Sequence, residues 1–140
     1  MSGAIIAALF FTVALLVTTA YFIMGSIPLL VLKHDTPLDA RFVRGFFNFY
    51  YVAACITAGA TAISYAIAGR AGVAAGAAGL AMIAVVLRKI VIPKMDSLGA
   101  QMQANYMDAM PGFRKIHIAA ILINIAQLAA IVWSLMAFSR

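Results

Sequence analysis

The chain has 140 residues, of which 66% are hydrophobic and 10% are charged, and its mean hydropathy is +1.05. Soluble domains carry about 25% charged residues, so this composition excludes an ordinary soluble enzyme or binding domain. The formal net charge of +6 suits the anionic headgroups of a membrane, and nothing in the sequence indicates nucleic-acid binding.

Four apolar stretches are long enough to cross a bilayer, which takes about 20 residues of helix. They cover residues 4–32, 46–69, 71–92 and 116–138. We therefore predict an all-α fold in which residues 1–140 form one integral membrane domain, an antiparallel four-helix transmembrane bundle. The first stretch has no basic residue before its apolar run and is longer than a signal-peptide core, so we predict a spanning helix there.

In stretch 4–32, Thr12, Thr19 and Ser26 recur at seven-residue spacing, which places their hydroxyl groups on one face of a helix. Pro28 lacks a backbone N–H and clashes with the preceding turn, so we expect the helix to kink or end there. We expect Gly25 and Pro28 to shape the packing of this helix against its neighbours.

Stretch 46–69 opens with five aromatic residues, which are typical of an interfacial belt. They are Phe46, Phe47, Phe49, Tyr50 and Tyr51. Cys55 is the single cysteine of the chain, which excludes a disulfide framework and a thiolate metal site. Because only Gly69 and Arg70 separate this stretch from the next one, we predict that the two form a hairpin.

Stretch 71–92 is rich in small residues. Gly72 and Gly76 stand in GxxxG spacing, and Gly79 continues the pattern. Since missing side chains let another helix come close, we predict a helix contact on this face, either within the bundle or with a second protomer.

Beyond Pro93 the sequence is polar, but apolar residues recur at steps of three or four. They are Met95, Leu98, Met102, Tyr106 and Met110. We predict an amphipathic cytoplasmic segment between the third and fourth spans, either a separate surface helix or a continuation of the third, which ends at Pro111 and Gly112.

In stretch 116–138, His117, Asn124, Gln127 and Ser134 follow a helical step and share one face. Polar groups are costly in hydrocarbon, so this face should look into the bundle. Such side chains either hydrogen-bond across helices or line a pocket.

We predict a cytoplasmic-side pocket inside the bundle for a small lipophilic molecule. Its lining would include His117, Asn124, Gln127, Asn48, Arg88 and Arg114. Adjacent helical side chains diverge by about 100°, so we expect Arg88 to point inward, toward His117 or Asn48, and Lys89 to point outward.

His34 and His117 are the two histidines, and both lie toward the predicted cytoplasmic end. A haem held by both imidazoles is therefore an alternative. The Asp35-Thr36-Pro37 sequence beside His34 reads as loop, however, whereas a haem ligand normally stands on a firm helix. The sequence has no GxSxG, Walker A or HExxH motif, so it does not identify an enzyme.

Charge sets the predicted orientation. Eight of the ten Lys and Arg residues lie in the connections 33–45 and 93–115 or at the adjoining end of the third span. The positive-inside rule places these connections in the cytoplasm and both termini outside. We expect an integral protein of a bacterial inner membrane whose cytoplasmic face contacts anionic lipids.

Three short motifs carry a family resemblance: MGSIP at 24–28, IVIPKMDSL at 90–98, and FRKIH at 113–117 followed by Asn124. They resemble a family of small four-helix membrane proteins of unknown function, whose eukaryotic relatives include a protein linked to drug resistance. The resemblance marks seven positions, Gly25, Pro28, Pro93, Phe113, Arg114, His117 and Asn124. The chain is also similar in outline to anthrone-oxygenase-like small membrane proteins.

These observations favour a non-catalytic membrane protein that binds a lipophilic ligand or serves as an accessory subunit of a larger membrane complex. One alternative is a haem-binding or oxygenase-type redox protein that uses His117 and His34. Another is a small transporter, which would need a homodimer because one bundle offers little room for alternating access.

Overall fold

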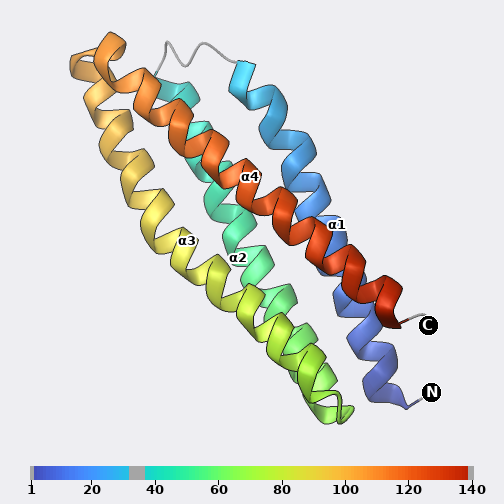
Figure 1. Ribbon diagram of the computed structural model, residues 1–140. Helices are drawn as coiled ribbons and strands as arrows, with labels where there is room; N and C mark the ends of the chain where they lie inside the picture. The colour runs from blue at the N-terminus through green and yellow to red at the C-terminus, as the bar shows by residue number, and fades with distance from the viewer. Residues whose placement is uncertain (1, 32–36, 139–140) are drawn as a thin grey trace.

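The computed structural model describes residues 2–31 and 37–138, which form four helices and no strand (Figure 1). The helices are α1 (Gly3–Val31), α2 (Pro37–Ile67), α3 (Ala71–Ala104) and α4 (Tyr106–Phe138). All four are long and apolar enough to cross a bilayer. The all-α, four-helix part of the prediction is therefore confirmed, and the helices indicate an integral membrane protein.

The helices enclose a common interior. Each packs against the next one along the chain, and α1 also packs against α4. Figure 1 shows the start of α1, the end of α4 and the α2–α3 turn at one end, with the start of α2 and the α3–α4 junction at the other. Large apolar side chains such as Phe10, Ile56 and Trp133 remain exposed around the outside. An apolar surface of this extent is suited to lipid rather than to water.

The main hydrophobic core lies in the half of the bundle that contains the α3–α4 junction. Phe22 of α1 stacks on Tyr50 of α2 with ring centroids 4.0 Å apart, and meets the edge of Phe47 at 4.8 Å. The predicted interfacial belt is wrong for Phe47, Tyr50 and Tyr51, which are buried, and only Phe49 is fully turned outward. These large rings fill the centre of this half and bury a large apolar area there.

The helices at this end extend beyond the predicted spans. α2 begins at Pro37, where proline suits the first helical position, so most of the expected 33–45 connection is helical. Residues 32–36 of that connection lie outside the described residues. α1 includes Pro28 and continues to Val31, so this proline does not end the helix.

No separate amphipathic segment divides the third and fourth helices in the described chain. α3 continues through Pro93 to Ala104, and only the extended residue Asn105 precedes α4. The stop predicted at Pro111 and Gly112 is wrong, because both lie inside α4. The alternative of a continued third helix fits, since the stripe residues Met95, Leu98 and Met102 are buried against the core.

Two glycines have specific structural roles, one in helix packing and one in a turn. An added Cβ at Gly25 would lie 2.6 Å from Cζ of Phe46, so the packing role predicted for Gly25 is confirmed. At the α2–α3 turn Gly69 has φ of +73°, a conformation that favours glycine. The Arg70 N–H donates to the Tyr65 carbonyl at 2.9 Å, which closes this short turn.

Candidate functional site

Two hydrogen bonds join polar groups across the interior. The Tyr50 hydroxyl of α2 donates to Oδ1 of Asn124 on α4 at 2.8 Å. Nε2 of His117 on α4 lies 3.0 Å from the carbonyl oxygen of Ser26 on α1. Because a carbonyl oxygen only accepts, Nε2 carries the proton in this contact. His117 and Asn124 are both 0% exposed, so the inward face predicted for them is confirmed.

Packing encloses these side chains on all sides. The His117 ring meets the edge of the Phe47 ring with centroids 4.9 Å apart. Among the described residues, Nδ2 of Asn124 and the Tyr51 hydroxyl oxygen make no hydrogen bond. Side chains occupy this part of the interior. The pocket predicted around His117 and Asn124 stays a prediction.

The other predicted lining residues do not join this cluster. Gln127 is half-buried. The inward orientation predicted for Ser134, which was not part of the lining set, is wrong, because this side chain is exposed. Arg114 is half-buried on α4, and its Nε has no hydrogen-bond partner among the residues that the structure describes. The predicted set therefore divides between the interior and the surface of the bundle.

Most hydroxyl groups of α1 and α2 bond within their own helices. Thr12 and Thr19 donate to the carbonyl oxygens of Ala8 and Leu15, four residues earlier, at 2.7 and 2.8 Å. Thr61 donates in the same way at 2.8 Å. The cross-helix hydrogen bonds considered for these hydroxyls are replaced by bonds that satisfy them locally.

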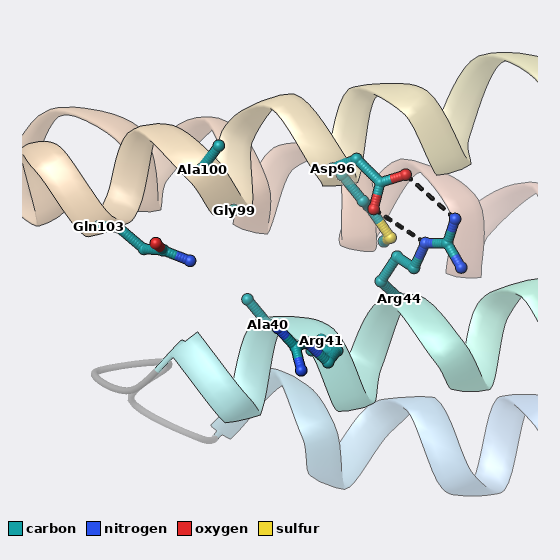
Figure 2. Close-up of a pocket in the computed structure, with 8 residues that line it drawn as sticks. Ala40, Arg41, Arg44, Asp96, Gly99, Ala100 and Gln103 are labelled. Carbon is teal, nitrogen blue, oxygen red and sulfur yellow. Dashed lines mark hydrogen bonds and ion pairs between the residues drawn. The ribbon is translucent and has the colours of Figure 1, made fainter.

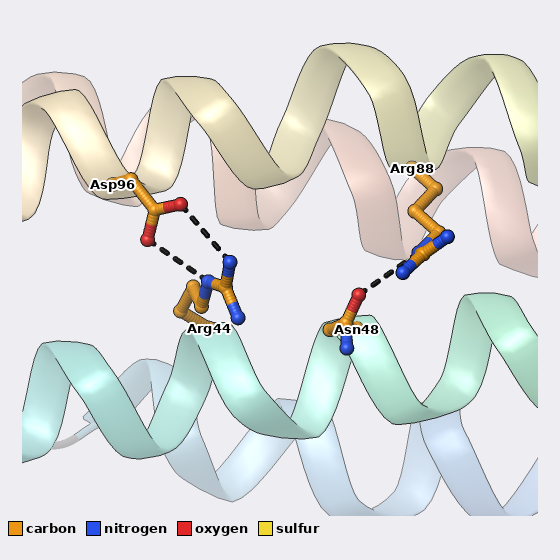
Figure 3. Close-up of polar contacts among 4 residues, drawn as sticks. All are labelled: Arg44, Asn48, Arg88 and Asp96. Carbon is orange, nitrogen blue, oxygen red and sulfur yellow. Dashed lines mark hydrogen bonds and ion pairs between the residues drawn. The ribbon is translucent and has the colours of Figure 1, made fainter.

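A polar seam runs along the junction of α2 and α3 (Figure 3). Nε of Arg88 donates to Oδ1 of Asn48 at 2.9 Å, so the contact expected between these two residues is present. Arg88 is nevertheless exposed, and the expectation that it points into the bundle is wrong. Two turns further along α3, Asp96 accepts from Nε and Nη2 of Arg44 at 2.9 and 3.1 Å.

The α2–α3 cleft opens beside the Arg44–Asp96 pair (Figure 2) and has a volume of about 390 Å³. Arg41 and Arg44 line it from α2, and Asp96 and Gln103 line it from α3. Met95 also lines the cleft, and small residues stand at the other positions, which leaves space between the two helices. These residues are Ala40, Gly99 and Ala100.

The α3–α4 groove lies in the other half of the bundle and has a volume of about 430 Å³. Figure 1 shows that α3 and α4 diverge toward the end that carries the chain termini. Small residues of both helices line the groove, including Gly72, Gly76, Ala77 and Ala130. Only two small hydrophobic clusters pack this half, so the divergence is not filled by core side chains.

Polar groups are few in the lining of the α3–α4 groove. Thr12, Thr61 and Ser134 contribute hydroxyl groups that already bond within their own helices. Arg70 lines the groove at the α2–α3 turn, and the largely exposed ring of Trp133 lines it from α4. A long apolar surface with a cation at one end fits an amphiphile.

The helix contact predicted for the glycines of α3 is not made among the residues that the structure describes. An added Cβ at Gly72, Gly76 or Gly79 would meet no atom within 4 Å, and the inner face of α3 is formed by Ala74 and Ala77. Gly72 and Gly76 line the α3–α4 groove instead. A contact with a second protomer through this face stays a prediction.

Metal-ligating side chains are scattered over the molecule. Residues 2–31 and 37–138 contain no group of three His, Cys, Asp or Glu side chains arranged around a metal position. His34 lies outside the described residues, and the His117 ring faces Ser26 and Phe47 rather than a cavity. The haem alternative therefore stays a prediction.

Comparison of the chain with protein-family models, with curated proteins and with solved structures finds no match. The resemblance to small four-helix membrane proteins stays a prediction.

Proposed function

We propose that the protein is a non-catalytic integral membrane protein that binds one lipophilic chain in the α3–α4 groove. The groove itself carries the proposal. Its volume of about 430 Å³ lies within the range of about 300–1,000 Å³ found for small-molecule sites. Its lining is mostly apolar with a few hydroxyl groups at fixed positions, which is the composition expected for such sites.

The position of the groove supports a lipid-like ligand. Its α3 wall extends from Gly72 to Leu80, about 12 Å along the helix axis at 1.5 Å per residue. With Arg70 at the membrane boundary, this length covers most of one leaflet of a hydrocarbon core about 30 Å thick. A ligand would enter sideways from the lipid, with its alkyl or isoprenoid chain in the groove and an anionic or polar headgroup at Arg70.

The proposal includes an orientation in the membrane. An antiparallel bundle that crosses four times would place the α3–α4 junction in the cytoplasm and the groove in the outer leaflet. The charge bias supports this orientation, since Arg70 is the only Lys or Arg near the opposite end among residues 2–31 and 37–138. The seam supports opposite helix directions, because Arg44 and Asn48 of α2 pair with Asp96 and Arg88 of α3 in reverse order.

Cysteine labelling tests this orientation. In a Cys55→Ala background, Ala71→Cys and Gln103→Cys would each be exposed to a membrane-impermeant maleimide in intact cells. We expect Ala71→Cys to react before permeabilisation and Gln103→Cys only afterwards. Reaction of both from the same side would contradict an odd number of crossings between them, and the opposite order would contradict the orientation.

Ligand binding is tested by crosslinking with a phospholipid that carries a photoreactive group in its acyl chain. Gly76→Leu places a large side chain in the groove, and Gly79→Leu is the matched control, because Gly79 is equally open but lies outside the lining. We expect Gly76→Leu to lose most of the crosslinks to α3 and α4, and Gly79→Leu to retain them. Equal crosslinking of both variants would contradict the proposal.

The material that copurifies with the protein separates the rival functions. A retained amphiphile in the wild type that is lost in Gly76→Leu supports ligand binding in the groove. A stoichiometric protein partner without a retained amphiphile would instead favour an accessory subunit. A Soret band in the purified protein would favour the haem alternative.

A further inference from the structure

We propose that the α2–α3 cleft binds the phosphate of an anionic phospholipid headgroup from the cytoplasmic leaflet. This second site lies at the opposite end of the bundle from the α3–α4 groove. It depends on α3 crossing the bilayer and not on ligand binding in the groove. The two proposals can therefore fail separately.

The cleft offers guanidinium donors on a fixed framework. Asp96 holds Arg44 through both of its carboxylate oxygens, which fixes the plane of the Arg44 guanidinium group (Figure 2). Nη1 of Arg44 and the whole guanidinium group of Arg41 make no hydrogen bond to the described part of the chain. Paired arginine groups match phosphate oxygens in geometry and charge.

The charge balance of the cleft favours one anion. Asp96 offsets the charge of Arg44, so Arg41 supplies the net positive charge. Gln103 points from α3 toward α2 and adds an amide that can donate to a second oxygen (Figure 2). Arg41, Arg44 and Gln103 thus provide donors from two helices around a space that small residues keep open.

The level of the cleft along the membrane normal favours a lipid as the source of the phosphate. Asp96 lies 25 residues beyond Ala71, about 38 Å along the axis of α3. The hydrocarbon core is about 30 Å thick, and the bilayer with its headgroups measures about 40–45 Å. With a usual tilt of about 20°, the Arg44–Asp96 pair lies at the level of the headgroups.

Native mass spectrometry of the full-length protein, titrated with phosphatidylglycerol or with phosphatidylcholine of the same acyl chains, tests the site. We expect one phosphatidylglycerol per chain and much weaker retention of phosphatidylcholine. Arg41→Gln should weaken phosphatidylglycerol binding about tenfold, the usual loss for one charge-assisted hydrogen bond. Lys115→Gln removes an exposed cation on α4 and should leave binding unchanged.

A second pair of variants keeps the charge constant. Ala100→Leu fills the cleft and should reduce phosphatidylglycerol binding, whereas Ala104→Leu lies outside the lining on the same helix and should not. An equal loss in Arg41→Gln and Lys115→Gln, or normal binding by Ala100→Leu, would overturn the proposal. Displacement of the lipid by inorganic phosphate at constant ionic strength would overturn it in favour of a soluble ligand.

Discussion

Removing the Tyr50 hydroxyl tests whether the interior hydrogen bond between α2 and α4 stabilises the fold. Tyr50→Phe keeps the ring that stacks on Phe22 but removes the donor to Oδ1 of Asn124. Because Nδ2 of Asn124 has no partner among the described residues, the variant leaves the whole amide unsatisfied in a fully buried position. Such a loss costs about 1–3 kcal/mol of unfolding free energy.

A second substitution tests whether Tyr50 and Asn124 stabilise each other. Asn124→Leu removes the buried amide and replaces it with an apolar side chain of similar volume. The double variant Tyr50→Phe/Asn124→Leu leaves neither partner unsatisfied, so we expect it to be more stable than Tyr50→Phe alone. The coupling energy should be about 0.6–1.7 kcal/mol, the range measured between helices in membranes.

Unfolding would be measured in mixed micelles of increasing SDS fraction, followed by the near-ultraviolet circular dichroism of the aromatic core. Tyr21→Phe is the control, because it removes a hydroxyl group from a residue that is 71% exposed. If the effects of Tyr50→Phe and Asn124→Leu add within about 0.3–0.5 kcal/mol, the two side chains are not coupled. That result would refute the hydrogen bond as a stabilising contact between α2 and α4.

Two further predictions concern packing and the seam. Gly25→Ala should destabilise the protein by about 1–3 kcal/mol, because the added Cβ would overlap the Phe46 ring. Gly45→Ala should be tolerated, because Gly45 stands in an open position. Thermal unfolding of both variants checks this prediction. Asp96→Asn should change the unfolding free energy by less than about 1 kcal/mol, because the Arg44–Asp96 pair is exposed; a larger loss that persists in high salt would contradict this view.

The four helices could be predicted from the sequence because hydropathy reports directly on the residues inside the hydrocarbon core. The helix ends beyond that core could not be predicted, because water and headgroups solvate a polar helix as well as they solvate a polar loop. Residues 37–45 and 93–104 are helical for this reason, although their sequences are polar. Pro93 and Pro111 misled the prediction because a proline removes only one backbone hydrogen bond in a long, well-packed helix.

The inward face of α4 could be predicted because His117 and Asn124 follow the helical period. Their partners could not, since the sequence does not contain the register between helices that are distant in the chain. Tyr50 illustrates the difficulty, because an aromatic residue near a helix end fits an interfacial belt and a core equally well. The Tyr50 hydroxyl reaches Asn124 across the interior, because α2 and α4 lie diagonally opposite each other in the bundle.

The small residues of α3 show a different limit. Gly72 and Gly76 allow either a close helix or an open groove, and the choice depends on how far α4 diverges. The seam had a usable signal, since Arg44 and Asn48 share a face of α2 and Arg88 and Asp96 lie two turns apart on α3. The reverse order of these residues suits two helices that run in opposite directions, but the spacing of four residues on α2 and eight on α3 does not predict both pairs.

The two halves of the bundle differ in how their interiors are packed. Stacked rings and interior hydrogen bonds fill the half that contains the α3–α4 junction, whereas the half that contains the α3–α4 groove has only small clusters. Gly76→Leu should therefore lower lipid crosslinking while it leaves the unfolding free energy nearly unchanged, and Tyr50→Phe should do the reverse. If Gly76→Leu instead unfolds the protein, the groove is part of the structural core, and its open space no longer supports a binding site.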